Sequence, residues 1–138
     1  MQFSAYLHFN GNCKQAFAYY QKHLGGKIAM SMTYGEAPGE MSLTDATRDL
    51  IIHTRLAIGD FTLMGSDNPP SVQTPVPMQG FNITFNVPNT AEAERVFKAL
   101  SVNGEVRQPL TETFFAHRFG MVTDQFGLPW MVIYEKTA

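Results

Sequence analysis

The feature that most constrains the fold is an internal repeat of a strand-like pattern. Residues 3–9, FSAYLHF, and residues 81–87, FNITFNV, lie 78 positions apart and place apolar side chains at every second position. Such alternation is typical of a β-strand with one buried face. A repeat of this kind indicates two copies of one supersecondary unit, so we expect the chain to build the same module twice.

Each of these strands is followed by a polar cap and an amphipathic helical pattern. The apolar positions of the two helices are Ala16, Tyr19 and Tyr20, and Ala93, Val96 and Phe97. Glycines, which favour a left-handed C-cap, follow at Gly25, Gly26 and Gly104. Three more strand patterns follow in each half, at 27–34, 49–59 and 61–67, and at 105–110, 115–124 and 128–134. The order βαβββ therefore occurs twice.

A proline-rich stretch separates the two halves. Four of the eight prolines fall within residues 67–79, DNPPSVQTPVPMQ, which shows neither strand nor helix periodicity. We expect a single domain over residues 1–138, with a first module at 1–68, a linker at 69–79 and a second module at 80–138. The expected fold class is α+β, with the two βαβββ modules pairing into a curved mixed sheet around a cavity.

Charge and composition exclude several classes of partner. A net charge of −2, with Lys and Arg scattered singly, argues against nucleic acid and against a membrane surface. One cysteine cannot form an internal disulfide, and no apolar run approaches the roughly twenty residues that span a bilayer. No signal-like segment opens the chain, so we expect a soluble cytoplasmic protein.

Polar residues at the alternate strand positions predict a ligand site. They are Tyr6 and His8 in the first strand, Asn82 in its repeat, and His53 and Arg55 in the third strand. A purely structural interior would rarely collect so many polar groups, because each buried one needs a hydrogen-bonding partner. We therefore expect a cleft that binds a small organic molecule, with His53 and Arg55 suited to an anion.

Two loop segments carry further candidate binding residues. Residues 112–120, ETFFAHRFG, combine aromatic and basic side chains that could hold a flat, negatively charged molecule, although a surface hairpin explains them as well. These candidates are Phe114, Phe115, His117 and Arg118. The loop at 34–45 is rich in glycine and acidic residues, so Tyr34 could close over a ligand or simply belong to a solvated turn.

The whole chain resembles the vicinal-oxygen-chelate superfamily of glyoxalase I, extradiol dioxygenases, fosfomycin-modifying enzymes and bleomycin-binding proteins. It is most similar to the PhnB-like branch in residues 6–26, 53–67 and 111–132. Members of that branch often carry the name demethylubiquinone methyltransferase, but no strand here opens into a glycine-rich turn for S-adenosylmethionine. The resemblance implies a homodimer. It also implies that the last strand is an interior strand lining the cavity, with Trp130 at the margin of the pocket.

Metal-ligand positions of the superfamily can be carried over one by one. They fall on Ser4 or Ala5, on Asn82, on Leu63 or Met64, and on Met131 or Val132. None of these is His, Asp or Glu, whereas a divalent metal needs three or four strong donors. We therefore expect no metal and no other cofactor.

The expected function is thus that of a PhnB-like protein that binds a small aromatic or anionic molecule in a metal-free cavity. The alternative is a lyase or isomerase in which His53 or His8 acts as a general base or as a displaced metal ligand. A third reading is a hollow filled by the protein's own aromatic side chains, in a module that only mediates association.

Overall fold

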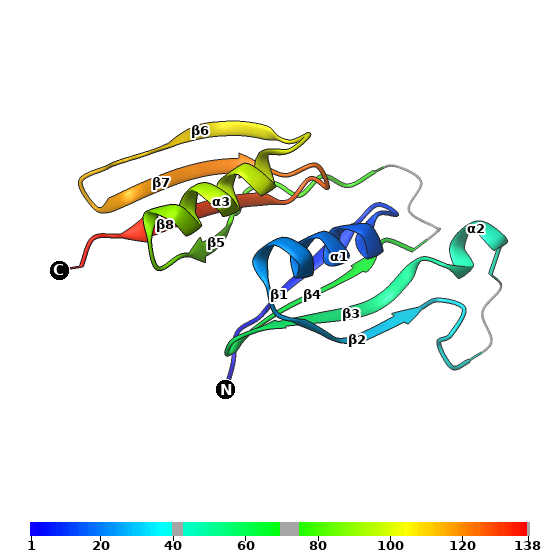
Figure 1. The fold of residues 1–138 in the computed structure, drawn as a ribbon. Helices are drawn as coiled ribbons and strands as arrows, with labels where there is room; N and C mark the ends of the chain where they lie inside the picture. The colour runs from blue at the N-terminus through cyan, green and yellow to red at the C-terminus, as the bar shows by residue number, and fades with distance from the viewer. Residues whose placement is uncertain (40–42, 70–74, 138) are drawn as a thin grey trace. The chain divides into compact units, whose positions relative to one another are not determined.

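The computed structural model describes residues 1–39, 43–69 and 75–137. The chain divides into two compact units, Met1–Val76 and Pro77–Ala138. Each unit holds one four-stranded mixed sheet and a helix that packs against it (Figure 1). The α+β class and the two βαβββ modules are confirmed. In the described residues, no helix is long and apolar enough to cross a membrane.

The first unit follows the predicted element order. Its elements are β1 (Ala5–Phe9), α1 (Cys13–Leu24), β2 (Lys27–Thr33), β3 (Ile51–Ile58) and β4 (Phe61–Asp67). The strand order is β1-β4-β3-β2, with β1 parallel to β4 and the other pairs antiparallel. A four-residue helix, α2 (Asp45–Arg48), precedes β3 and was not predicted, because so short an element shows no helical periodicity.

The second unit repeats this arrangement. Its elements are β5 (Ile83–Asn86), α3 (Thr90–Ser101), β6 (Glu105–Thr111), β7 (Ala116–Thr123) and β8 (Pro129–Glu135). The order β5-β8-β7-β6 pairs β8 on both sides, which confirms that the last strand is interior. The helix α3 ends at Ser101, three residues before the predicted Gly104. Of the predicted linker, residues 70–74 lie outside the described residues.

Strand alternation gives each sheet one face that packs on a helix and one that points away from it. In the first unit, Leu7 and Gly65 are register partners on the α1 side. A Cβ at Gly65 would lie 2.8 Å from a ring carbon of Phe17 in α1, so only glycine permits this approach. In the second unit, a Cβ at Gly120 would lie 2.6 Å from Phe97 of α3. We call the opposite side of each sheet its open face.

A buried carboxylate joins the elements of the first unit at the end of β4. Asp67 is 1% exposed. One of its oxygens, Oδ1, accepts hydrogen bonds from the backbone N–H groups of Gly11 and Cys13, both at 3.0 Å. The other, Oδ2, accepts from the N–H of Ile51 at 2.8 Å. The start of α1 and the start of β3 are therefore both held by one side chain.

We predict that Asp67→Asn lowers the free energy of unfolding by about 2–4 kcal/mol. The amide turns an N–H₂ group toward a backbone donor, and the remaining bonds lose their charge assistance. Urea unfolding followed by circular dichroism measures the change. The control is Asp60→Asn, which makes the same change at an exposed turn. Equal midpoints for the two variants would contradict the assigned role of Asp67.

Candidate functional site

Four of the predicted site residues lie together on the open face of the first sheet. The hydroxyl oxygen of Tyr6 is 3.0 Å from Nδ1 of His53, and their rings stack with centroids 5.6 Å apart. The Tyr6 ring also contacts the ring of His8, at 5.3 Å. Register places Arg55 opposite Met64, which is itself opposite Tyr6. The two-residue period of the strands therefore brings one phenol, two imidazoles and one guanidinium to the same surface.

A pocket of about 330 Å³ opens within the second unit. It is lined by Met78, Gln79, Gly80, Phe81, Asn82, Arg107, Met121, Thr123 and Pro129. Its apolar side chains are those of two methionines, a phenylalanine and a proline. The polar groups are amides, one hydroxyl and one guanidinium. Asn82 is the predicted site residue that lines this pocket.

The guanidinium of Arg107 is positioned by its neighbours in the sheet. Its Nε donates a hydrogen bond to Oγ1 of Thr123 at 2.8 Å. Its terminal nitrogen lies 3.7 Å from a carboxylate oxygen of Glu105, in a pair that is more than half exposed on both sides. Such an exposed pair is weak, so a bound anion can compete with it. Sequence reasoning missed Arg107, because only the cross-strand pairing with β7 reveals that it borders a pocket.

The aromatic side chains of the predicted 112–120 segment form a cluster at the hairpin between β6 and β7. Phe114 is 92% exposed and Phe115 is 40% exposed, with ring centroids 5.1 Å apart. Phe115 also packs edge-on against Phe119 at 5.2 Å. None of these three rings lines the pocket.

The basic residues of the same hairpin contact other groups. His117 packs against the ring of Tyr134 at 4.7 Å, and Nη1 of Arg118 donates to the backbone oxygen of His117 at 2.6 Å. Glu112 pairs with Lys136 at 3.2 Å, and this contact lowers the pKa of the Glu112 carboxyl. The structure therefore places His117 and Arg118 beside each other but not in the pocket with Asn82.

Tyr34 lies in the core of the first unit rather than on a flap. It is 8% exposed, and its hydroxyl donates to the backbone oxygen of Asp67 at 3.0 Å. Burial and the nearby Asp67 charge raise the pKa of its phenol. The same two causes raise the pKa of the buried Cys13 thiol, which therefore stays protonated. Residues 40–42 of the predicted flap lie outside the described residues.

Trp130 lies in the core of the second unit, not at the margin of the pocket as expected. It is 1% exposed, and its indole Nε1 donates to Oδ2 of Asp124 at 2.8 Å. The register pairs it with Ile83 and Val122. Val122 shares the α3 side of β7 with Gly120, because two residues along a strand point the same way. The adjacent Pro129 lines the pocket instead.

The metal positions implied by the family resemblance do not fit a divalent ion. On the first sheet the paired residues are Ala5 with Leu63 and Tyr6 with Met64. On the second sheet Thr84 is paired with Met131. These side chains, with Ser4 and Asn82, supply hydroxyl, amide and thioether donors, which bind divalent ions weakly. Within residues 1–39, 43–69 and 75–137, no group of three or more His, Cys, Asp or Glu could hold a metal.

A protein family and a bacterial protein match this chain over nearly its whole length. The family model described as Glyoxalase/Bleomycin resistance protein/Dioxygenase superfamily matches residues 3–132. Protein YjdN of Escherichia coli (strain K12) is 36% identical over 146 residues, which cover 99% of this chain and 97% of YjdN.

Solved structures that share the fold include the following two. Protein PA1353 from Pseudomonas aeruginosa is 45% identical, with a TM-score of 0.90 and 99% of each chain covered. The PhnB protein from Bacillus cereus is 20% identical, with a TM-score of 0.79 over 97% of this chain and 99% of that one. At this identity the PhnB likeness is one of fold alone.

The burial of the only Trp predicts a shielded fluorophore. We expect iodide to quench Trp130 emission several-fold less in the native protein than in protein unfolded in urea, because the core excludes the ion. Emission should shift to longer wavelength on unfolding. Native quenching as strong as that of the unfolded chain would contradict the core position.

Proposed function

The chain belongs to the Glyoxalase/Bleomycin resistance protein/Dioxygenase superfamily, and from this premise we propose that it binds a small aromatic or anionic organic molecule in the pocket of its second unit. One observation carries the proposal: a positioned guanidinium, that of Arg107, borders a pocket whose walls combine apolar and polar side chains. On family resemblance alone, we further propose that the protein acts as a homodimer in the cytoplasm.

The size and lining of the pocket suit a compact ligand. A volume of about 330 Å³ lies at the lower end of the roughly 300–1,000 Å³ that small-molecule sites occupy. Met78 and Met121 can adapt to different ring shapes, since methionine is flexible and polarizable. Phe81 is 42% exposed and offers a ring surface for stacking.

The polar groups of the pocket suit a carboxylate on that ligand. A guanidinium can bind a carboxylate through two parallel hydrogen bonds, which adds orientation to charge pairing. The Arg107–Thr123 hydrogen bond restricts the guanidinium before any ligand arrives, so less side-chain entropy is lost on binding. The Asn82 amide can donate to or accept from a second polar group. An aryl carboxylate combines the apolar body and the anionic end that this lining requires.

We predict that benzoate binds and that neutral benzamide binds more weakly. Arg107→Gln should weaken benzoate binding at least about tenfold, which corresponds to about 1.4 kcal/mol of binding free energy. Isothermal titration calorimetry measures the affinities. Thr123→Val should cause a smaller loss, because it frees the guanidinium without removing the charge.

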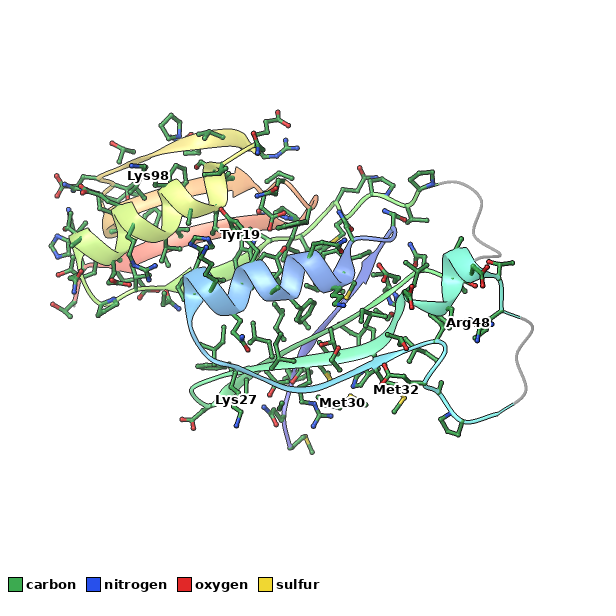
Figure 2. All side chains as sticks on the ribbon, turned by 45° about the vertical axis from the view of Figure 1, so that its right-hand side comes forward. Tyr19, Lys27, Met30, Met32, Arg48 and Lys98 are labelled. Carbon is green, nitrogen blue, oxygen red and sulfur yellow. The ribbon has the colours of Figure 1, made fainter. Side chains whose placement is uncertain are left out.

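The matched control is Lys98→Gln. It removes one positive charge from the same unit, on the exposed side of α3 (Figure 2). Benzoate affinity should remain that of the wild type in this variant. If Arg107→Gln and Lys98→Gln behave alike, the pocket is not the binding site.

A second candidate function is acid–base catalysis on the open face of the first sheet. In the tautomer with the proton on Nδ1, this N–H donates to the Tyr6 hydroxyl oxygen at 3.0 Å, which orients the imidazole and leaves Nε2 unprotonated to accept a substrate proton. A base held by a second polar group is the arrangement that proton-abstracting sites share. His8 contacts the same tyrosine ring and is the alternative base. This geometry favours a lyase or isomerase that removes a proton next to a carbonyl.

For this second function we predict that the protein speeds deuterium uptake from D₂O at the acidic carbon of small 2-keto acids. His53→Gln should abolish the acceleration, and Tyr6→Phe should reduce it by freeing the ring. His8→Gln separates the two candidate bases. Proton NMR follows the exchange, and a wild-type rate equal to that of buffer alone would rule out catalysis on these substrates.

A further inference from the structure

The edge strand of the first sheet carries two thioethers on its open face. Residues 30–32 read Met-Ser-Met within β2, and the register is regular across these three positions. Met30 is opposite Arg55, and Met32 is opposite His53. Figure 2 shows both methionine side chains on the side of β2 that points away from α1. Because cross-strand partners point to the same face, two sulfur atoms and one imidazole share this surface.

The spacing of these three side chains permits them to converge. Directly opposite residues have Cβ atoms about 4.5–5.5 Å apart, which is the relation between Met32 and His53. Residues two apart in a strand are separated by roughly 6.6 Å, and a methionine side chain with three rotatable bonds spans that gap. The backbone here is anchored, since the buried Thr54 hydroxyl donates to the backbone oxygen of Met30 at 3.1 Å.

The three groups are also accessible. Met30 is 37% exposed, while Met32 and His53 are half-buried. The Tyr6 hydroxyl holds His53 at Nδ1, which leaves Nε2 to face a ligand. Imidazoles that bind metals commonly have their second nitrogen held in this way, because the contact fixes the ring orientation.

The donor chemistry selects the kind of ion. Thioethers are soft, uncharged donors that bind Cu(I) well and hard or borderline divalent ions poorly. We propose that Met30, Met32 and His53 form a binding site for a soft monovalent cation, Cu(I) or its non-redox analogue Ag(I). These residues differ from the inherited metal positions and from the pocket of the second unit. The ion site and the pocket of the second unit can therefore stand or fail independently. His53 is shared with the acid–base candidate, and the methionine variants distinguish the two, because only the ion site needs the thioethers.

One nearby charge opposes a cation at this position. Arg55 lies opposite Met30 and is exposed to solvent. Two unit charges about 4 Å apart in water repel each other by only about 1 kcal/mol. Three coordinate bonds, two from soft thioethers and one from an imidazole, outweigh a repulsion of that size.

The test uses protein whose methionine methyl groups carry carbon-13, titrated with silver nitrate in chloride-free buffer. We expect the methyl resonances of Met30 and Met32 to move first and to stop moving at one equivalent. Those of Met78 and Met121 in the pocket should stay in place. Met30→Leu and Met32→Leu, which nearly conserve volume, assign the two signals.

The affinity for Cu(I) is measured by competition with the chelator bicinchoninate under anaerobic conditions. The double variant Met30→Leu/Met32→Leu should lose at least about 100-fold in affinity, and His53→Gln about tenfold. Met78→Leu is the matched control and should bind Cu(I) with the affinity of the wild type.

Cys13 remains in every variant, so Cu(I) affinity that survives the double substitution would point to the thiol and overturn the proposal. First movement of other methionine signals, or no movement at all, would overturn it equally. Circular dichroism verifies that each variant is folded.

Discussion

The arrangement of the first unit depends on the hydrogen bonds of one buried carboxylate. Asp67 ends β4 and accepts backbone N–H groups from the loop before α1, from the first residue of α1 and from the first residue of β3. A buried carboxylate is tolerated only when its oxygens accept hydrogen bonds, so Asp67 can be buried only because it makes these bonds. With α1 held against one side of the sheet, Tyr6 and His53 are left together on the other side.

A second buried carboxylate has a similar role in the second unit. Asp124 follows β7 and accepts the backbone N–H groups of Phe126 and Leu128, which closes the turn into β8. Its other oxygen accepts the indole N–H of Trp130. The last strand is thereby fixed between β5 and β7, and the Trp near the C-terminus has its polar atom satisfied in the core. Pro129, one residue earlier, is left to line the pocket.

Periodicity in the sequence was enough to predict the modules and the open face of the first sheet. Tyr6 and His8 share a face because they are two residues apart in one strand, and His53 and Arg55 share a face for the same reason. The short helix α2 escaped prediction because four residues show no period.

Long-range contacts explain the other differences. Trp130 was expected at the margin of the pocket. Strand alternation turns Pro129 and Trp130 to opposite faces of the sheet, and only the pairing of β8 with β5 and β7 decides which of the two faces the core. Tyr34 was expected either to close over a ligand or to belong to a solvated turn, but it is buried, and its hydrogen bond to Asp67 spans 33 residues. Arg107 joins the pocket through Thr123, a partner 16 residues away. Contacts of this kind leave no local pattern in a single sequence.

The most direct test of the binding role is to locate a bound aryl carboxylate by intermolecular nuclear Overhauser effects. With benzoate on methyl-labelled protein, we expect contacts from the ring protons to the methyl groups of Met78 and Met121, which line the pocket. Contacts confined to Met30, Met32 or Met64 on the first sheet, or to no methyl group near the pocket, would contradict a ligand site in the second unit.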